Sequence, residues 1–584
     1  MPLKLPDLFK LPFLACFVTV AAGMALSVLP HAVWWAKAGD PAWIADNDDL
    51  YYLALGSQAY FNHPGHLSDP ALPRGGFSPH RWLPYVPGVL VTRLLGWGPL
   101  GISLVWRTWA GMSIALGWFL IGRQYVRTPW MAAALAMFLM ADIGAMECKP
   151  VLRQARVSAD LLAGRSVPEL QGKPRVHVAW RLSTPGLTLG FLLLHVGLLA
   201  RARANPTGGR LVASGLGFGL LFYVYFYSWT AAGLALLIGL GLDSGARRVY
   251  FQTGWIGGLA GLPAFVSDLL AKRANSADWL LRTDKFLPIG HLDELMLPRL
   301  TLLLAALGFV WVLWKRRDLM PVGALAASGL LWTNHQVVTG LQIENFHWLV
   351  YVANPMLELL LVLIAAGAIE PWLAGSRGAR WAFGMVVAIY LADGLWLRAV
   401  EAERSTEPRA HLAEYREYRG QRFGLGSPRL APNAVIAGEN DLTLLAAVLE
   451  NQRPLEGMPV LLSPSIRTEE WNERISLNGF LTIGDRAAFE AEARRQLAKF
   501  DWGPWNRDPA ARARLLARRI ELYDTVGLDP AAALDRFGVR YLARLGPGPP
   551  PDQVRSGWSL LQAGPRWSLW QRRPSSSPPS ERSP

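Results

Sequence analysis

Asp46, Asp48 and Asp49 stand within four residues of one another, just after the first long apolar run. Carboxylates this close repel one another, so the group needs a cation, an arginine partner or a proton. The Asp46-x-Asp48 spacing suits a shared divalent cation such as Mg or Mn. Any of the three could instead act as general base toward a hydroxyl nucleophile. The structural alternative is that Asp46 caps a helix over 50–59, with the other two carboxylates in its first turn.

A second group of polar side chains fills the short segment 334–347, between two apolar runs. Amides and imidazoles can hydrogen-bond sugar hydroxyls there, and the tryptophan that follows can stack on a sugar face. The imidazoles and the carboxylate could instead join the aspartates around a metal ion. The alternative is a loop whose side chains satisfy one another. The candidate substrate-binding residues are His335, Gln336, Gln342, Glu344, His347 and Trp348.

Cationic side chains supply a third group. Segment 148–182 is rich in lysine and arginine and could bind phosphate or pyrophosphate, or it could be a solvated loop. Arg107 lies roughly 8 residues into the second apolar run, about 12 Å along a helix. It is therefore expected to face protein rather than lipid, where it could pair with Asp142, pair with the aspartates or hold a phosphate. The candidates in this group, with the acidic residue beside them, are Arg107, Glu147, Lys149, Arg153 and Arg156.

Apolar runs must position these groups. Of the 584 residues, 52% are hydrophobic and 17% are charged, against about 25% charged in soluble domains. This composition excludes an ordinary cytosolic enzyme and a disordered chain. Segment 82–97 is apolar but broken by prolines, which indicates an interfacial or re-entrant helix. Runs of about 20 apolar residues predict transmembrane helices. We expect about eleven, at 11–34, 98–121, 129–147, 183–200, 211–228, 229–242, 250–270, 298–314, 319–333, 348–368 and 381–399.

Lysine and arginine in the short connections set the orientation of these spans. With Lys4 and Lys10 inside, every second connection is short and basic and also lies inside. An odd number of spans then places the C-terminal part outside. The net charge is 58 − 44 = +14. Inside loops and a site for an anionic lipid explain this charge without nucleic acid. The connections predicted outside include 35–81, 148–182, 271–297 and 334–347.

The composition changes near residue 400. We expect a transmembrane domain over 1–400, a charged linker over 401–430 and a small α/β domain over 431–573. The tail 574–584 is disordered by composition. Periodicity within the α/β domain predicts strands at 434–436, 460–462, 539–542 and 568–570, and helices at 442–450, 487–500 and 510–523.

Together these features resemble the GT-C superfamily of integral-membrane glycosyltransferases. The resemblance lies in many spans, an acidic motif in the first outer loop, an interfacial helix after it and an outer C-terminal domain. The segment 536–542 looks like the soluble domain of uncharacterised bacterial members. The resemblance implies a GT-C-like fold and a multi-pass protein of the bacterial inner membrane. It also implies transfer of a sugar from a polyprenyl-phosphate donor to an acceptor hydroxyl at the outer membrane face.

Carried onto this chain, the resemblance makes Asp48 or Asp46 the base or the ligand of a divalent cation. Glu147 stands where some members place a second acidic motif, although the chain lacks a full D-x-D or E-x-D pair there. Two other functions fit a polytopic protein: a transporter or flippase of a lipid-linked glycan, and a non-catalytic partner in envelope assembly. Convergence of the aspartates, Glu147 and the 334–348 loop would favour the enzyme.

Overall fold

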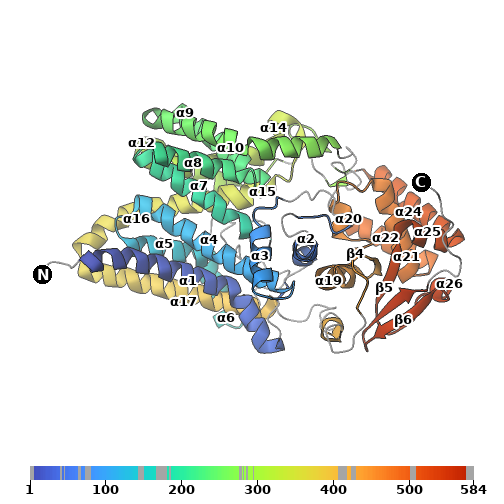
Figure 1. Cartoon of the computed structure of the whole chain (residues 1–584). Helices are drawn as coiled ribbons and strands as arrows, with labels where there is room; N and C mark the ends of the chain where they lie inside the picture. Colours follow the sequence, from blue (N-terminus) through green and yellow to red (C-terminus); the bar gives the residue numbers. More distant parts are fainter. Residues whose placement is uncertain are drawn as a thin grey trace.

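The protein is mostly helical, and a small sheet lies near its C-terminus (Figure 1). The computed structural model describes a set of residue ranges, and every structural statement below concerns these. They are 5–39, 43–44, 47–62, 67–72, 81–141, 150–165, 180–182, 186–274, 279, 282–283, 287–293, 295–296, 298–405, 417–421, 429–499 and 508–573. Asp46, Asp142, Glu147 and Lys149 lie outside the described residues, as do most of the predicted linker and the tail.

A helix lies at each of the eleven apolar runs. Within the described residues, five helices are long and apolar enough to cross a membrane, and α9 with α10, bent by 110°, can form a sixth span. The described parts of α5, α8, α12 and α13 are shorter than the roughly 20 residues that an untilted span requires, so they do not pass this test on their own. The helices are α1 (Leu5–Ala38), α4 (Gly101–Tyr125), α5 (Pro129–Ala141), α7 (Gly186–Ala204), α8 (Gly208–Leu221), α9 (Phe226–Leu242), α10 (Arg247–Ala274), α12 (Arg299–Trp314), α13 (Met320–Thr333), α16 (Asn354–Gly375) and α17 (Arg377–Ser405).

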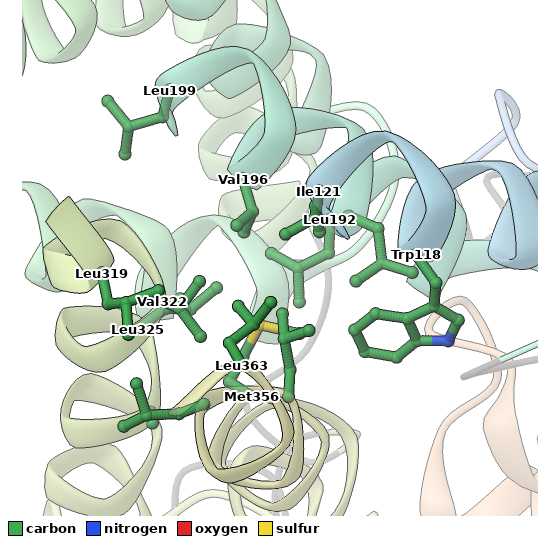
Figure 2. Packing of buried hydrophobic residues seen from close by; sticks show 14 of the residues in the cluster. Trp118, Ile121, Leu192, Val196, Leu199, Leu319, Val322, Leu325, Met356 and Leu363 are labelled. Carbon is green, nitrogen blue, oxygen red and sulfur yellow. The ribbon is translucent and has the colours of Figure 1, made fainter. Parts of the chain in front are cut away.

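The helices of the bundle pack through apolar side chains and small residues. Figure 2 shows Trp118 and Ile121 of α4 against Leu192 of α7, with Met356 of α16 close by. Lipid is as apolar as these side chains, so close backbone approach has to supply much of the attraction. A Cβ at Gly111 would lie 2.3 Å from the carbonyl oxygen of Gly23, so only glycine allows α1 and α4 this contact.

Short elements lie at the end of the bundle that faces the α/β domain, and Figure 1 shows α2 and α3 between the two parts. We call this end of the bundle the domain end. The nine-residue α3 is too short to span and exposes Leu90, Val91 and Leu94, as an interfacial helix does. The short elements are α2 (Asn47–Phe61), α3 (Val86–Leu94), α6 (Pro150–Leu162), β1 (Leu287–Pro288), α14 (Gln336–Thr339), β2 (Leu341–Gln342), α15 (Phe346–Trp348) and the π-helix η5 (Leu349–Ala353). The 3-10 helices η3 (Ser244–Ala246) and η4 (Arg317–Leu319) lie between spans.

The C-terminal α/β domain has one five-stranded sheet, of order β4-β3-β5-β7-β6. Strand β3 is parallel to β4 and β5, whereas β7 is antiparallel to β5 and β6. The strands are β3 (Val435–Gly438), β4 (Arg453–Pro454), β5 (Val539–Leu545), β6 (Trp558–Ala563) and β7 (Trp567–Arg572). The helices are α19 (Asn440–Glu450), α20 (Met458–Leu462), α21 (Thr468–Thr482), α22 (Arg486–Lys499), α24 (Pro509–Leu528), α25 (Pro530–Phe537) and α26 (Asp552–Arg555).

The predicted strand at 460–462 is wrong, because these residues form the end of helix α20. A short apolar run fits a buried strand or a buried helix equally well. Pro459 decides the outcome at the start of this helix, where a missing N–H costs nothing and the fixed φ of proline suits the first turn.

Helix α19 of the α/β domain packs against α2 of the domain end. Leu53 and Ala54 of α2 share one buried apolar cluster with Leu445 of α19. At the C-terminal ends of the two helices, Gln58 Nε2 donates to Asn451 Oδ1 over 3.2 Å. This contact places the α/β domain directly over the helix that carries Asp48 and Asp49.

Two buried carboxyl groups make the stability of this region depend on pH. Burial raises the pKa of Glu456 from 4.5 to about 7, against the hydrogen bond from Asn478 and the charge of Arg519. Burial likewise raises the pKa of Asp69 from 3.8 to about 6, against hydrogen bonds to its carboxylate and the charge of Arg474. The folded state therefore binds these protons more tightly than the unfolded chain does.

We expect the α/β domain to lose stability as pH rises from about 4.5 through 7. The contribution of Glu456 is complete below its unfolded pKa and is lost as pH passes its folded pKa of about 7. E456Q should therefore stabilise the domain at pH 8 and flatten its profile, measured as hydrogen exchange of β3 and α21 against pH. The exposed D552N serves as control. If E456Q is less stable than the wild type at pH 8, or if its stability depends on pH as steeply as that of the wild type, Glu456 does not cause the pH dependence.

Candidate active site at the domain end

Asp48 and Asp49 open helix α2 and point in different directions. The side chain of Asp49 is 6% exposed, and its Oδ2 lies 2.5 Å from Arg107 Nη2. The side chain of Asp48 is 48% exposed and lies 3.8 Å from Arg181 Nη2. Both carboxylates also lie in the first turn of α2, where the helix dipole stabilises negative charge. The alternative of a purely structural role in the first turn predicts this position. The structure therefore divides the motif into a buried ion pair and a half-exposed carboxylate beside Arg181.

Arg107 is fully buried, and protein groups engage each of its guanidinium nitrogens. Besides Asp49, Nε donates to the Trp180 carbonyl over 2.7 Å, and Nη1 donates to Ser103 Oγ and the Trp43 carbonyl. The guanidinium also lies 4.5 Å from the Trp43 ring centroid. Of the three roles expected for Arg107, the structure shows pairing with the aspartate motif. A contact with phosphate stays a prediction, and in this structure it would have to share a guanidinium that protein groups already engage.

Arg181 and Tyr351 extend the site beyond Asp48. The Arg181 guanidinium lies over the Tyr351 ring at 6.0 Å from its centroid. The Tyr351 hydroxyl interacts electrostatically with Asp48, Arg181 and Glu344. Tyr351 belongs to η5, a single π-helical turn, and such turns occur frequently at functional sites. Tyr351 thus connects the aspartate motif to the 334–347 loop.

Glu344 and His347 form the opposite side of this cluster. Tyr227 donates to Glu344 Oε2 over 2.6 Å, and Tyr225 Oη lies 2.9 Å from His347 Nδ1. Glu344 has a φ of 23°, in the left-handed region that only strong surrounding contacts impose on a side chain of this kind. We call Asp48, Arg181, Tyr351, Glu344, His347, Tyr225 and Tyr227 the acid–tyrosine cluster.

Three of the residues predicted to contact a sugar, His335, Gln336 and Trp348, are buried in protein in this conformation. Trp348 is fully buried, stacks on Trp332 and donates to Thr230 Oγ1 over 3.0 Å, so its face is not available to a sugar. Gln336 is fully buried and accepts from Asn345. His335 is also buried, and burial lowers its pKa. In this structure these three side chains have protein partners, as the alternative of a loop with mutually satisfied side chains predicts, and their contact with a sugar stays a prediction.

The remaining predicted residues do not join the cluster in the described part of the structure. Glu147, Lys149 and the side chains of Arg153 and Gln342 lie outside it. Arg156 stands on α6, with Asp160 as its ion-pair partner at 3.7 Å. Among the described residues, no group of three or more His, Cys, Asp or Glu side chains is arranged to hold a metal ion.

Sequence reasoning missed Tyr351 and left Arg181 out of the candidate residues. Arg181 was visible as the last cation of the basic segment, directly before an apolar run. Tyr225 and Tyr227 were visible as an aromatic turn, which a membrane interface explains equally well. Tyr351 had no signal, because it lies within an apolar run where one tyrosine is unremarkable.

The fold and the cluster define a class: a polytopic helical membrane protein whose bundle ends in charged and aromatic side chains beneath a small α/β domain. No family model and no curated protein matches the chain. A solved structure that it resembles is ArnT from Cupriavidus metallidurans bound to undecaprenyl phosphate, at 12% identity and a TM-score of 0.49. The alignment covers 97% of this chain and 99% of that one. Similarity at this level of identity does not assign a substrate to this chain.

Proposed function

We propose that the protein is a GT-C-type membrane glycosyltransferase. It would transfer a sugar from a polyprenyl-phosphate-linked donor to an acceptor hydroxyl at the outer membrane face. The observation that carries the proposal is the acid–tyrosine cluster, which joins a half-exposed carboxylate, a cation and a wall of hydroxylated rings at one end of an apolar bundle. A hydroxyl acceptor, an anionic leaving group and a sugar ring each require one of these three chemistries.

Each group would have one task in the transfer. Asp48 would take the proton of the acceptor hydroxyl as its oxygen forms a bond to the anomeric carbon. The bond from that carbon to the phosphate oxygen breaks, and the lipid phosphate leaves with the electron pair. Arg181, 3.8 Å from Asp48, would stabilise the charge that develops on the phosphate. Tyr225, which is partly exposed, would hydrogen-bond the sugar, and the buried Tyr227 would hold Glu344 in place.

The orientation is part of the proposal. The basic residues of the short connections support an inside location for the end of the bundle opposite the α/β domain. The acid–tyrosine cluster and the α/β domain would then face outward in a bacterial inner membrane. A cysteine introduced at exposed Asp552, in a chain whose Cys16 and Cys148 are replaced by serine, should react with a membrane-impermeant maleimide in intact spheroplasts. Labelling that requires permeabilised membranes would reverse the topology and leave the chemistry to be tested separately.

The decisive test is sugar transfer by the purified protein. Protein in nanodiscs is incubated with isotope-labelled polyprenyl-phosphate sugars and candidate acceptors, and mass analysis of the products should show a labelled glycoside and free polyprenyl phosphate. Donor lipid that crosses the bilayer without cleavage would instead support the flippase hypothesis. Unchanged donor in every assay, together with stable binding of a glycan to the α/β domain, would support a non-catalytic assembly protein.

A divalent cation held by Asp46 and Asp48 is the alternative to Arg181 as partner of the aspartates. Hard carboxylate oxygens suit Mg or Mn. Chelation with EDTA in the same assay separates the two. Loss of transfer that Mg or Mn restores would assign a metal cofactor, whereas full activity in EDTA would assign Arg181.

A further inference from the structure

Arg282 ties the membrane domain to the α/β domain. It belongs to the connection between α10 and α12, yet it is fully buried against the α/β domain. Its Nε donates to the carbonyl of Leu461, Nη2 to Ser463 and Nη1 to Ile466, over 3.1, 2.8 and 2.7 Å. The last carbonyl groups of a helix accept no hydrogen bond from within that helix. Arg282 donates hydrogen bonds to carbonyl groups at and just beyond the end of α20.

Trp279 strengthens the same attachment. Its Nε1 donates to the Leu462 carbonyl over 3.0 Å, and its ring is buried. The guanidinium of Arg282 also lies 5.8 Å from the ring centroid of Trp471 on α21. Trp279 and Arg282 thus donate hydrogen bonds to three successive carbonyl groups, those of residues 461, 462 and 463. Because both side chains are buried, this attachment is more specific than a single ion pair at the surface.

The connection then continues to the loop that carries Glu344. Pro288, six residues after Arg282, pairs with Leu341 in the two-stranded sheet β1-β2. Ile289 N donates to the Gly340 carbonyl over 2.9 Å. Further along, Asn334 and the backbone of Met296 exchange two hydrogen bonds of 2.9 and 3.0 Å. Glu344 follows β2 by two residues.

We infer that Arg282 is a positioning residue, through which the docked α/β domain holds Glu344 and His347 in place. The left-handed φ of Glu344 is a conformation that persists only when the surroundings impose it. The β1-β2 pairing and the Asn334 contacts impose it from one side, and Arg282 anchors the same connection to the α/β domain five residues before β1. The catalytic consequence rests on the proposed glycosyl transfer, but the mechanical coupling does not.

R282A tests the coupling by hydrogen exchange in the full-length protein in nanodiscs. Exchange should rise at 461–466, where the carbonyls lose their donor, and also at 287–289 and 336–345, which Arg282 does not touch. If sugar transfer is observed in the wild type, kcat should fall about 10- to 100-fold through misplacement of Glu344. KM for the donor should change little. R282K should restore part of the protection, because one ammonium replaces a three-nitrogen fork.

A matched variant removes the hydrogen bonds between Asn334 and the backbone of Met296, which lie closer to Glu344 in the same series of contacts. N334A should raise exchange at 336–345 while it leaves 461–466 protected. R572A, which removes an arginine that holds Asp535 within the same domain, should leave 336–345 unchanged. If R282A does not fold, W279F removes a single N–H donor and should give a smaller rise in the same segments.

Unchanged exchange at 336–345 in R282A, or in W279F if R282A does not fold, would overturn the inference. A wild-type protein that transfers no sugar would overturn the proposed function alone, because the exchange experiment still decides the coupling. Conversely, active protein with no coupling would leave the proposed function intact.

Discussion

Replacing Asp48 by asparagine should abolish sugar transfer while the protein remains folded. The amide side chain keeps the size of the carboxylate but cannot accept the proton of the acceptor hydroxyl. General bases commonly contribute 10²- to 10⁴-fold in rate, so a loss of about 10³-fold in kcat is expected. The fold should tolerate the change, because this side chain is 48% exposed and its contact with Arg181 is long, at 3.8 Å. Such exposed pairs contribute little to stability.

The control for D48N is the same substitution at another exposed carboxylate in the first turn of a helix, away from the acid–tyrosine cluster. Asp552 stands in the first turn of α26 and its side chain is 95% exposed, so D552N should retain full transfer. Donor affinity is measured separately, because loss of a base lowers kcat rather than binding. If the double variant D46N/D48N keeps activity, neither aspartate is the base and the assignment fails.

Much of the fold follows from the sequence because long apolar runs admit few structures. Each of the eleven runs became a helix, since an apolar segment of that length must satisfy its backbone hydrogen bonds internally in lipid. Five of the helices pass the length and apolarity test, and the 110° bend between α9 and α10 was not visible in hydropathy. The error at 460–462 has the same origin: hydropathy reports burial and does not report backbone geometry.

The candidate site was only partly predictable, because residue type does not reveal which face is buried. Asp48 and Asp49 are adjacent and chemically identical, yet only Asp49 reaches Arg107. Trp348 and Tyr351 stand one helical turn apart, yet Trp348 is fully buried against Trp332 and Tyr227, whereas Tyr351 lies beneath the guanidinium of Arg181. These distinctions arise from contacts between segments far apart in the chain. Glu344 and His347 could be proposed from the sequence because a polar run between apolar spans is a local signal.

Replacing Arg107 by alanine should destabilise the protein more than any other change considered above. It leaves the Asp49 carboxylate buried without a counter-ion and removes donors from the carbonyls of Trp43 and Trp180. Breaking one side of a buried ion pair costs about 3–5 kcal/mol. The first turn of α2 would also lose its anchor, so transfer by Asp48 should fall with stability. The loss is measured as the melting temperature in nanodiscs.

A double variant separates the effect of the charges of Asp49 and Arg107 on stability from the effect of their packing. D49L/R107M replaces both charged groups by apolar ones of similar size, and such exchanges are often neutral for stability. It should therefore melt well above R107A. Its transfer activity should stay low if the ion pair orients Asp48, and should recover if the pair only stabilises the fold. The exposed pair of Arg486 and Asp524 is the control, and R486A should melt like the wild type. An R107A variant that melts like R486A would show that the buried pair does not hold α2 in place.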